Sequence, residues 1–347
     1  MGKIIVKEFF KSKMKPIFAD DAAIDYAAHL LRQGRLVAFP TETVYGLGAD
    51  ASNPDAVRRI FQAKGRPADH PLIVHIPSID SLNDWALTVP DAAQQLAARF
   101  WPGPLALILN KRPEVPLAVT GGQNTVGLRM PDHPVALHLL RAFSGGIAAP
   151  SANRFCRISP TQATHVEEEL GDAVDLILDG GACQVGVEST IVDLSGNRPK
   201  LLRPGHITRY DIESVLQTEL MIISAQSEQA NQAKMRAPGM MAVHYAPSTV
   251  AVLCQDDRML EIIQELNFRN KRIGVLAYRS EQAENRLTRF IRMPEHAEDY
   301  AQALYTSLRG LDSLQLDIIL IEQPPQTEAW RAINDRLCKA TSTYKSN

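Results

Sequence analysis

The sequence predicts an α/β protein of two domains, a larger mixed α/β domain followed by a smaller three-layer one. Short apolar runs alternate with segments of helical periodicity along most of the chain, and this alternation is typical of α/β folds. The 347 residues suffice for two domains of ordinary size. A polar stretch that ends in a proline-bracketed segment interrupts the alternation at residues 218–247, and we interpret it as the linker between the domains.

The first domain, residues 1–217 with a short N-terminal extension, begins its pattern with a helix over residues 20–31. Apolar side chains recur there at helical spacing, and Gly34 ends the helix. Apolar runs predict buried strands at 36–39, 72–76, 105–109, 126–130, 147–149, 176–178 and 190–194. Helical patterns lie between several of these runs, at 55–63, 91–100, 134–141 and 161–170.

The second domain, residues 248–347, repeats the alternation on a smaller scale. Apolar runs predict strands at 250–253, 273–277 and 317–321, and helical patterns follow at 259–266, 297–311 and 327–339. In the second of these helices Tyr300, Leu304, Leu308 and Leu311 keep to one face. About 100 residues with this pattern predict a compact three-layer α/β unit.

Composition excludes several classes of protein. The 37 basic and 39 acidic residues give a net charge of −2, which argues against binding nucleic acid by bulk charge alone. No apolar run reaches the roughly 18 residues of a membrane span, and the first residues do not resemble a secretory signal. The four cysteines are widely spaced and suit neither a disulfide framework nor a zinc site. We therefore predict a cytoplasmic protein without membrane contact.

Polar side chains gather at four turns next to predicted strands. These turns are the stretch 40–48, which contains Thr41, the residues from Arg129 to 134, the segment with Ser151 and Asn153, and the segment 186–190, which contains Ser189. Such turns are common, but α/β proteins place their sites there, so four in one domain favour a polar ligand site.

Lys64 and Arg66 flank a glycine at the end of a predicted helix. A lysine and an arginine beside a glycine suit a polyphosphate, although three residues alone fit a solvated helix end at least as well. Arg203 is a second arginine that could complete an anion pocket. Neither standard phosphate loop is present. Ser151 lacks the nucleophile-elbow motif, His75 fits a core or a ligand role, and no cluster has metal-site spacing.

Eight strings of this sequence resemble the YrdC-like domain, in family order over about 190 residues. They are PTETVYGLGA (40–49), KGRP (64–67), HPLIVH (70–75), WPGPL (101–105), RMPDHP (129–134), AAPSAN (148–153), GVEST (186–190) and LRPG (202–205). The segment 238–247 and the small domain after it resemble the two-domain Sua5 form. The resemblance implies a YrdC-like twisted mixed sheet with helices and a Rossmann-like Sua5 domain.

The family's activity is L-threonylcarbamoyladenylate synthesis. The implied reaction joins L-threonine, bicarbonate (or CO2) and ATP into threonylcarbamoyl-AMP and pyrophosphate, for t6A modification of position 37 in tRNAs that read ANN codons. The implied enzyme is a nucleotidyltransferase that hands its product to the downstream tRNA threonylcarbamoyl-transfer machinery, with at most a weak contact to tRNA. Mg²⁺ is expected as the ATP complex, with no protein side chain as its ligand.

The resemblance also assigns site residues one by one. Lys64, Arg66, Ser151 and Asn153 match the family's KxR and SxN pairs and are the expected catalytic residues. The expected ATP contacts are these four together with Thr125, Ser159, Arg203, His244 and Tyr245. The expected threonine contacts are Thr41, His75, Arg129 and Ser189, with Arg129 suited to the substrate carboxylate. His244 and Tyr245 lie in the linker segment that folds over the nucleotide.

Two departures from the family and two alternatives accompany this interpretation. Residues 154–157 read RFCR where the family usually has a Ser-Gly step, and residues 239–244 read GMMAVH where an aromatic and a basic residue usually precede the histidine. An RNA-binding module is the main alternative, disfavoured by the charge balance and by the absence of RNA-binding motifs. A hydrogenase-maturation carbamoyltransferase would need zinc fingers that the sequence lacks.

Overall fold

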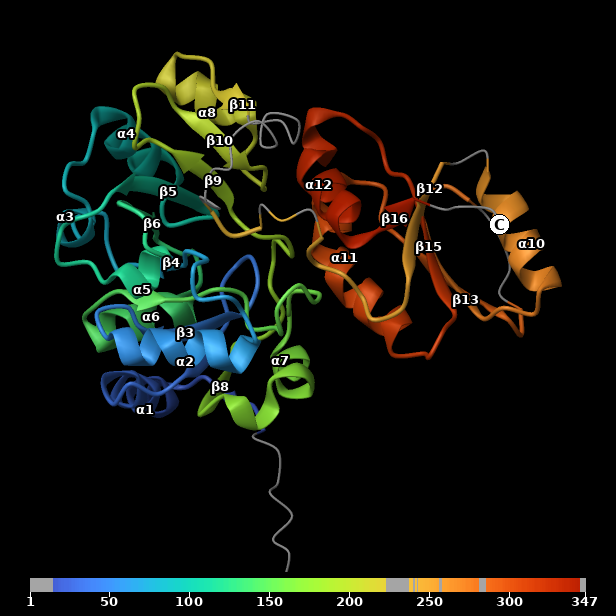
Figure 1. Cartoon of the computed structure of the whole chain (residues 1–347), viewed down its shortest axis with the longest axis horizontal. Helices are drawn as coiled ribbons and strands as arrows, with labels where there is room; N and C mark the ends of the chain where they lie inside the picture. Colours follow the sequence, from blue (N-terminus) through green and yellow to red (C-terminus); the bar gives the residue numbers. More distant parts are fainter. Residues whose placement is uncertain are drawn as a thin grey trace, which may run out of the picture.

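The computed structural model describes residues 15–222, 237–239, 241, 243–255, 258–280 and 285–343. Of the predicted linker, residues 223–236, 240 and 242 lie outside the described residues, as do residues 1–14 of the predicted N-terminal extension. The chain forms a larger unit (residues 15–222) and a smaller unit (residues 248–343), which lie side by side in Figure 1. The predicted α/β fold class is confirmed in both units.

The larger unit is built on a mixed sheet of eleven described strands. Their order across the sheet is β1-β8-β2-β3-β7-β4-β6-β5-β9-β10-β11. The strands are β1 (Ile17–Phe18), β2 (Val37–Phe39), β3 (Gly46–Asp50), β4 (Ile73–His75), β5 (Leu105–Asn110), β6 (Thr125–Arg129), β7 (Ile147–Ala148), β8 (Leu176–Asp179), β9 (Thr190–Asp193), β10 (Lys200–Arg203) and β11 (Met221–Ile222). Each of the seven predicted strands of this unit is present within two residues of its expected bounds.

Side chains cap the start of several helices of the larger unit. They are α1 (Asp21–Arg32), α2 (Pro54–Lys64), α3 (Leu82–Trp85), α4 (Asp91–Phe100), α5 (Leu117–Thr120), α6 (Pro134–Phe143), α7 (Ala163–Glu169) and α8 (Arg209–Leu216). The Asn53 side chain caps the start of α2, and Gly65 ends the helix with φ of 63°. Because a positive φ suits glycine, Gly65 turns the chain between Lys64 and Arg66.

Strand β3 lies where the sequence indicated only a turn. It pairs antiparallel with β2, with Phe39 opposite Gly46 and Val37 opposite Gly48. A Cβ at Gly48 would lie 2.8 Å from the Phe39 ring and 3.1 Å from the Val37 carbonyl oxygen. Glycine therefore lets β3 approach the buried ring, and the polar residues 40–45 become the loop of a β-hairpin.

The smaller unit is a parallel five-stranded sheet with the described order β14-β13-β15-β12-β16. Its elements are β12 (Ala251–Cys254), α10 (Met259–Phe268), β13 (Ile273–Ala277), β14 (Thr288–Arg292), α11 (Ala297–Asp312), β15 (Ile318–Glu322), α12 (Arg331–Ala340) and β16 (Ser342–Thr343). In Figure 1, α11 and α12 lie on the side of the sheet that faces the larger unit, and α10 lies on the far side. The predicted three-layer arrangement is confirmed, and α11 and α12 form the interface.

The two units share one apolar cluster. Val44, Ile158 and Val187 of the larger unit pack into the core cluster that contains Tyr305 and Leu308 of α11. Polar contacts surround this cluster, including an ion pair of Arg309 with Glu169. Among the described residues every helix is too short or too polar to cross a bilayer.

A substitution at Gly186 is expected to disrupt the contact between the units. Gly186 has φ of 79°, and a Cβ there would lie 2.4 Å from the Cα of Gln302 in α11. We expect Gly186→Ala to lower the free energy of unfolding by about 3 kcal/mol, from backbone strain plus the clash. Gly181→Ala is the control, because Gly181 has φ of 89° with open space around it, and strain alone costs about 1 kcal/mol. Urea denaturation measures both; equal losses would show that α11 does not restrict Gly186.

Candidate active site

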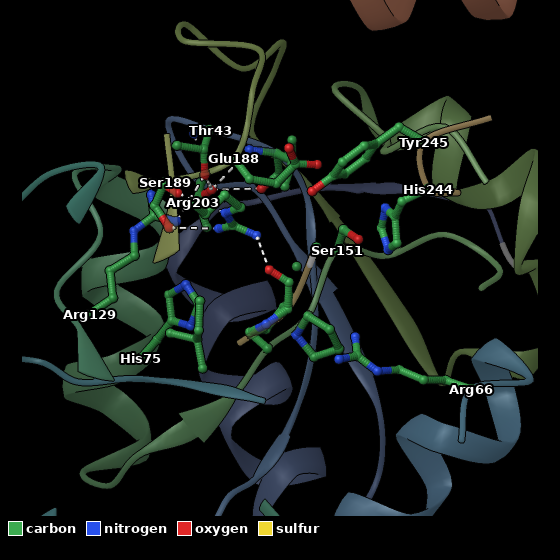
Figure 2. A pocket seen from close by; sticks show the side chains of 18 residues that line it. Thr43, Arg66, His75, Arg129, Ser151, Glu188, Ser189, Arg203, His244 and Tyr245 are labelled. Atoms are coloured by element: carbon green, nitrogen blue, oxygen red, sulfur yellow. Dashed lines mark hydrogen bonds between the residues drawn. The ribbon is translucent and has the colours of Figure 1, made fainter. Parts of the chain in front are cut away.

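A cavity lies between the larger unit and the linker residues (Figure 2). Its lining comes from β3 and β4, from the last residues of β6 and β10, from the loops after β2, α2 and β7, from the loop before β9, and from Pro238, Gly239, His244 and Tyr245. Figure 2 shows Arg129 and His75 on one side of it and Arg66, His244 and Tyr245 on the other. The cavity volume of about 50 Å³ is far below the several hundred cubic ångströms of a pocket for a drug-sized ligand. As described, the cavity is therefore too small for a whole nucleotide.

Three buried arginines give the cavity a positive wall. Arg203, the last residue of β10, donates from Nε to the Ser189 carbonyl oxygen at 3.0 Å and from Nη2 to Ser189 Oγ at 3.1 Å. Arg66 donates from Nη2 to the Pro71 carbonyl oxygen at 3.0 Å, and its buried Nε has no partner in the described structure. Burial lowers the pKa of Arg66 to about 10. Buried cations with unused donors favour an anionic ligand.

Arg129, at the end of β6, is held by several neighbours. Its Nη1 donates to Thr43 Oγ1 at 3.0 Å, its Nε donates to the Gly103 carbonyl oxygen at 3.3 Å, and its Nη2 lies 2.7 Å from Oε1 of the buried Glu42. The predicted threonine ligand is thus a fixed group whose charge Glu42 already balances. Sequence reasoning quoted Thr43 and Glu42 within the motif at 40–49 but assigned neither a role.

His75 and Thr41 complete the predicted threonine pocket in different ways. His75 is buried beside Arg129, and both burial and the Arg129 charge lower its pKa, to about 3. The imidazole is therefore neutral, with Nδ1 unpartnered among the described residues. Thr41 Oγ1 donates to the Val44 carbonyl oxygen at 2.6 Å and accepts from the amides of Thr43 and Val44. Thr41 lines the cavity while its hydroxyl folds the hairpin loop.

Lys64 lies behind the cavity wall, bound to the loop that carries Ser151. Its buried Nζ donates to the carbonyl oxygens of Ser151 at 2.6 Å and Asn153 at 2.5 Å. Burial, with the nearby charge of Arg66, lowers the pKa of Lys64 to about 7. The ammonium can therefore hold the loop of Ser151 and Asn153 in place, and its pKa lies near neutral pH.

The loop after Ser151 adopts a tight turn without glycine. Asn153 Nδ2 donates to the carbonyl oxygens of Arg154 and Arg157, and Cys156 has φ of 62°. The Cys156 carbonyl oxygen accepts from the amide of Ala246, and the Phe155 ring lies between the rings of His70 and His244. The RFCR sequence thus has a left-handed residue at Cys156 and makes an aromatic contact to the linker.

His244 and Tyr245 close the cavity from the linker side. The His244 amide donates to the Lys339 carbonyl oxygen of α12 at 3.0 Å. The Tyr245 ring stacks on Tyr305 with centroids 6.0 Å apart, and Arg336 lies 5.2 Å from its centroid. The Tyr245 hydroxyl is buried without a described partner, and burial raises its pKa to about 12. It is therefore a proton donor near the cavity that no protein group uses.

The structure does not bring every predicted residue to the cavity wall. Thr125 begins β6, four residues from Arg129, and does not line the cavity. Ser159 is buried, and its Oγ donates to Oε1 of Glu188 at 2.5 Å. Lys64 and Asn153 lie in the layer behind the lining. Glu188 does line the cavity, and sequence reasoning assigned it no role although it lies in the quoted GVEST motif.

Comparisons with known proteins show the family of this chain. Residues 29–205 match the Sua5, YciO and YrdC family, described as telomere recombination, and residues 207–342 match the C-terminal domain of threonylcarbamoyl-AMP synthase. A threonylcarbamoyl-AMP synthase of Pyrococcus abyssi is 42% identical over 92% of this chain and 94% of its own length. One of Bacillus subtilis is 42% identical over 96% of this chain and 97% of its own length.

Solved structures give the same result. The crystal structure of P. abyssi Sua5 complexed with L-threonine is 43% identical, has a TM-score of 0.84, and matches over 92% of this chain and 94% of that chain. A variant of that protein, with a neighbouring histidine and tyrosine replaced by alanine, has a TM-score of 0.83 at 40% identity, over 93% of this chain and 96% of that chain. The chain therefore belongs to the Sua5/YciO/YrdC family, in its two-domain Sua5 form.

Proposed function

We propose that this protein is a threonylcarbamoyl-AMP synthase, which converts L-threonine, bicarbonate or CO2, and ATP into threonylcarbamoyl-AMP and pyrophosphate. The observation that carries the proposal is the cavity whose lining contains three buried arginines, Arg66, Arg129 and Arg203. The threonine carboxylate and the ATP phosphates are anions that such a wall binds. The full-length similarity to synthases of that name supports the same reaction.

The reaction requires positioning more than a protein nucleophile. The threonine amine adds to the carbon of CO2 and loses a proton, which gives a carbamate; with bicarbonate the same carbamate forms and water leaves. An oxygen of the carbamate then attacks the α-phosphorus. The bond from that phosphorus to the bridging oxygen breaks, and pyrophosphate leaves. This is nucleotidyl transfer, and buried arginines stabilise the negative charge that develops at the phosphates.

Exclusion of water protects the product, which is a mixed anhydride. Tyr245 and His244 cover the cavity, and the neutral state of His244 follows from burial, which lowers its pKa to about 3. A closed linker keeps bulk water away from the carbamate and the anhydride. The predicted catalytic roles of Lys64, Arg66, Ser151 and Asn153 are part of this proposal.

We also propose that Mg²⁺ enters with ATP, where it neutralises phosphate charge. Glu188 is the acidic side chain in the cavity lining, and its carboxylate already accepts hydrogen bonds from Ser159, Tyr305 and Arg336. The phosphate oxygens would therefore hold the ion. The product is proposed to pass to the tRNA threonylcarbamoyl-transfer machinery.

The RNA-binding alternative has less support. Arg66, Arg129 and Arg203 are each at least nine-tenths buried, so their charges face the cavity rather than a surface that a nucleic acid backbone could reach. With a net charge of −2, the chain offers no general attraction to a polyanion.

Pyrophosphate release from ATP tests the proposed function. We expect release that requires both L-threonine and bicarbonate, measured with purified protein and with each substrate omitted in turn. Release with threonine alone, after rigorous CO2 removal, would indicate plain aminoacyl adenylation. No release, with measurable affinity for RNA, would favour the alternative.

A further inference from the structure

Glu188 is an unusual group in this cavity. It is buried, lies two residues before β9 and shares the lining with Arg66, Arg129 and Arg203. A bare carboxylate there would repel a substrate carboxylate or phosphate, and it would also compete for the arginines. The structure must therefore neutralise Glu188 by another group.

The smaller unit supplies that group. Arg336 of α12 is fully buried and donates from Nε to Oε2 of Glu188 at 2.8 Å. Tyr305 of α11 donates its hydroxyl to the same carboxylate, 3.0 Å from Oε2. Both donors come from helices that face the larger unit, so Glu188 is paired across the interface between the two units (Figure 1).

Arg336 also binds the backbone next to Ser189 and next to Arg203, two residues that line the cavity. Its Nη2 donates to the Glu188 carbonyl oxygen at 3.2 Å, and its Nη1 donates to the Pro204 carbonyl oxygen at 3.0 Å. Ser189 follows the first of these residues and Arg203 precedes the second. One planar guanidinium thus fixes the two loops that present Ser189 and Arg203.

Because Arg336 pairs with Glu188, Arg203 makes its hydrogen bonds elsewhere. It donates to Ser189 and to the Pro238 carbonyl oxygen rather than to Glu188. Although burial by itself raises the pKa of Glu188, the charges of Arg336 and Arg203 and the Ser159 hydroxyl lower it to about 2. Without Arg336, Arg203 is the other cation whose charge acts on this buried carboxylate, and a pairing of the two would turn Arg203 away from the ligand.

We propose that Arg336, assisted by Tyr305, is a positioning residue of the active site: it neutralises Glu188 and clamps the loops of Ser189 and Arg203, so that the smaller unit sets the affinity of the larger unit's cavity for anionic substrates. This inference rests on the proposed function. It gives the C-terminal unit a role in substrate binding through side chains that do not touch the substrate.

Calorimetric titration of the full-length chain with L-threonine and, separately, with ATP tests this role. We expect Arg336→Met to weaken both affinities by about ten- to a hundredfold, because it leaves a buried carboxylate unpaired. Arg336→Lys, which keeps the charge but loses the fork, should lose less. Tyr305→Phe should weaken both affinities about three- to tenfold. Arg331→Met is the matched control, since Arg331 lies on the same helix and pairs with Glu328 of its own unit.

Rescue separates this role from a merely structural one. We expect that adding Glu188→Gln to Arg336→Met restores at least half of the lost affinity, measured on a logarithmic scale. The double variant has no unpaired charge. Melting curves show whether each variant folds; if Arg336→Met does not fold, Arg336→Lys and Tyr305→Phe decide. Additive effects of Arg336→Met and Glu188→Gln, or unchanged affinities in the Arg336 and Tyr305 variants, would overturn the inference. A wild-type chain that binds ATP but releases no pyrophosphate would overturn the proposed function alone, because the coupling would still be measured in ATP affinity.

Discussion

Lys64→Met is expected to lower kcat/KM for ATP by about 10²- to 10³-fold while the protein stays folded. Lys64 Nζ binds the carbonyl oxygens of Ser151 and Asn153, so the substitution removes both the hydrogen bonds that hold the SxN loop and a cation next to the proposed phosphate site. Loss of one preorganised donor at a charged transition state has an effect of this size. Steady-state kinetics and a melting curve measure it. Lys200→Met, at a half-buried lysine of β10, is the control.

The same lysine gives the reaction a defined proton balance. In the free protein its pKa is about 7, lowered by burial and by Arg66, so at pH 8 most molecules carry a neutral amine. Bound phosphates favour the ammonium and raise the pKa, so ATP binding at pH 8 should take up close to one proton, and ATP affinity should fall as pH rises above 7. Calorimetry in two buffers of different ionisation enthalpy measures the uptake. Equal uptake by the Lys64→Met variant would contradict this assignment.

The sign for stability without ATP is the reverse of the usual lysine case. The folded protein releases this proton near pH 7, whereas the unfolded chain keeps it to about pH 10.4. Unfolding therefore takes up a proton between these values, and the contribution of Lys64 to the free energy of unfolding rises with pH. Below pH 7 both states are protonated and the burial of the ammonium opposes folding.

Local pattern was enough to predict the regular elements. Helix α4 and strand β13 have the predicted bounds, because the first has strong helical periodicity and the second is a continuous apolar run. Strands β3 and β14 escaped prediction for opposite reasons. β3 contains Gly48, which the neighbouring Phe39 ring requires, and β14 carries Arg289 and Arg292 around two apolar residues at a sheet edge. Packing partners far away in the sequence decide both cases.

The site was predictable as a set of motifs but not as a set of roles. Thr41, Ser151, Arg129 and Arg203 do line one cavity, yet no local pattern shows that the sheet mixes parallel and antiparallel pairs to bring their loops together. The Arg336–Glu188 pair joins residues 148 positions apart. A buried arginine in a C-terminal helix reads as an ordinary amphipathic residue until its partner is known. Only the tertiary contacts of Ser159 and Asn153 show that these side chains hold loops in place.

Tyr245→Ala is expected to produce the second large effect, a loss of retained product together with a fall of about 10²-fold in turnover. The buried Tyr245 ring packs against the rings of His244 and Tyr305 and lies next to the Arg336 guanidinium. Because the ring covers the cavity, its removal opens the cavity to water. Rapid quench followed by chromatography measures threonylcarbamoyl-AMP and pyrophosphate in the same sample. In the wild type their ratio should stay near one in the first turnover, and in Tyr245→Ala it should fall, because the anhydride hydrolyses after it forms.

Two further variants separate the ring from the hydroxyl. Tyr245→Phe keeps the stacked ring and removes only the unpartnered hydroxyl, so the product ratio should stay near the wild-type value. Its turnover should fall about three- to tenfold if the hydroxyl donates to a ligand. Tyr210→Ala, at an exposed tyrosine of α8, should change neither quantity. A Tyr245→Ala protein that forms and keeps its product like the wild type would show that the linker ring does not exclude water. In that case the small cavity would describe only the protein without substrate, and the linker would have no part in protecting the anhydride.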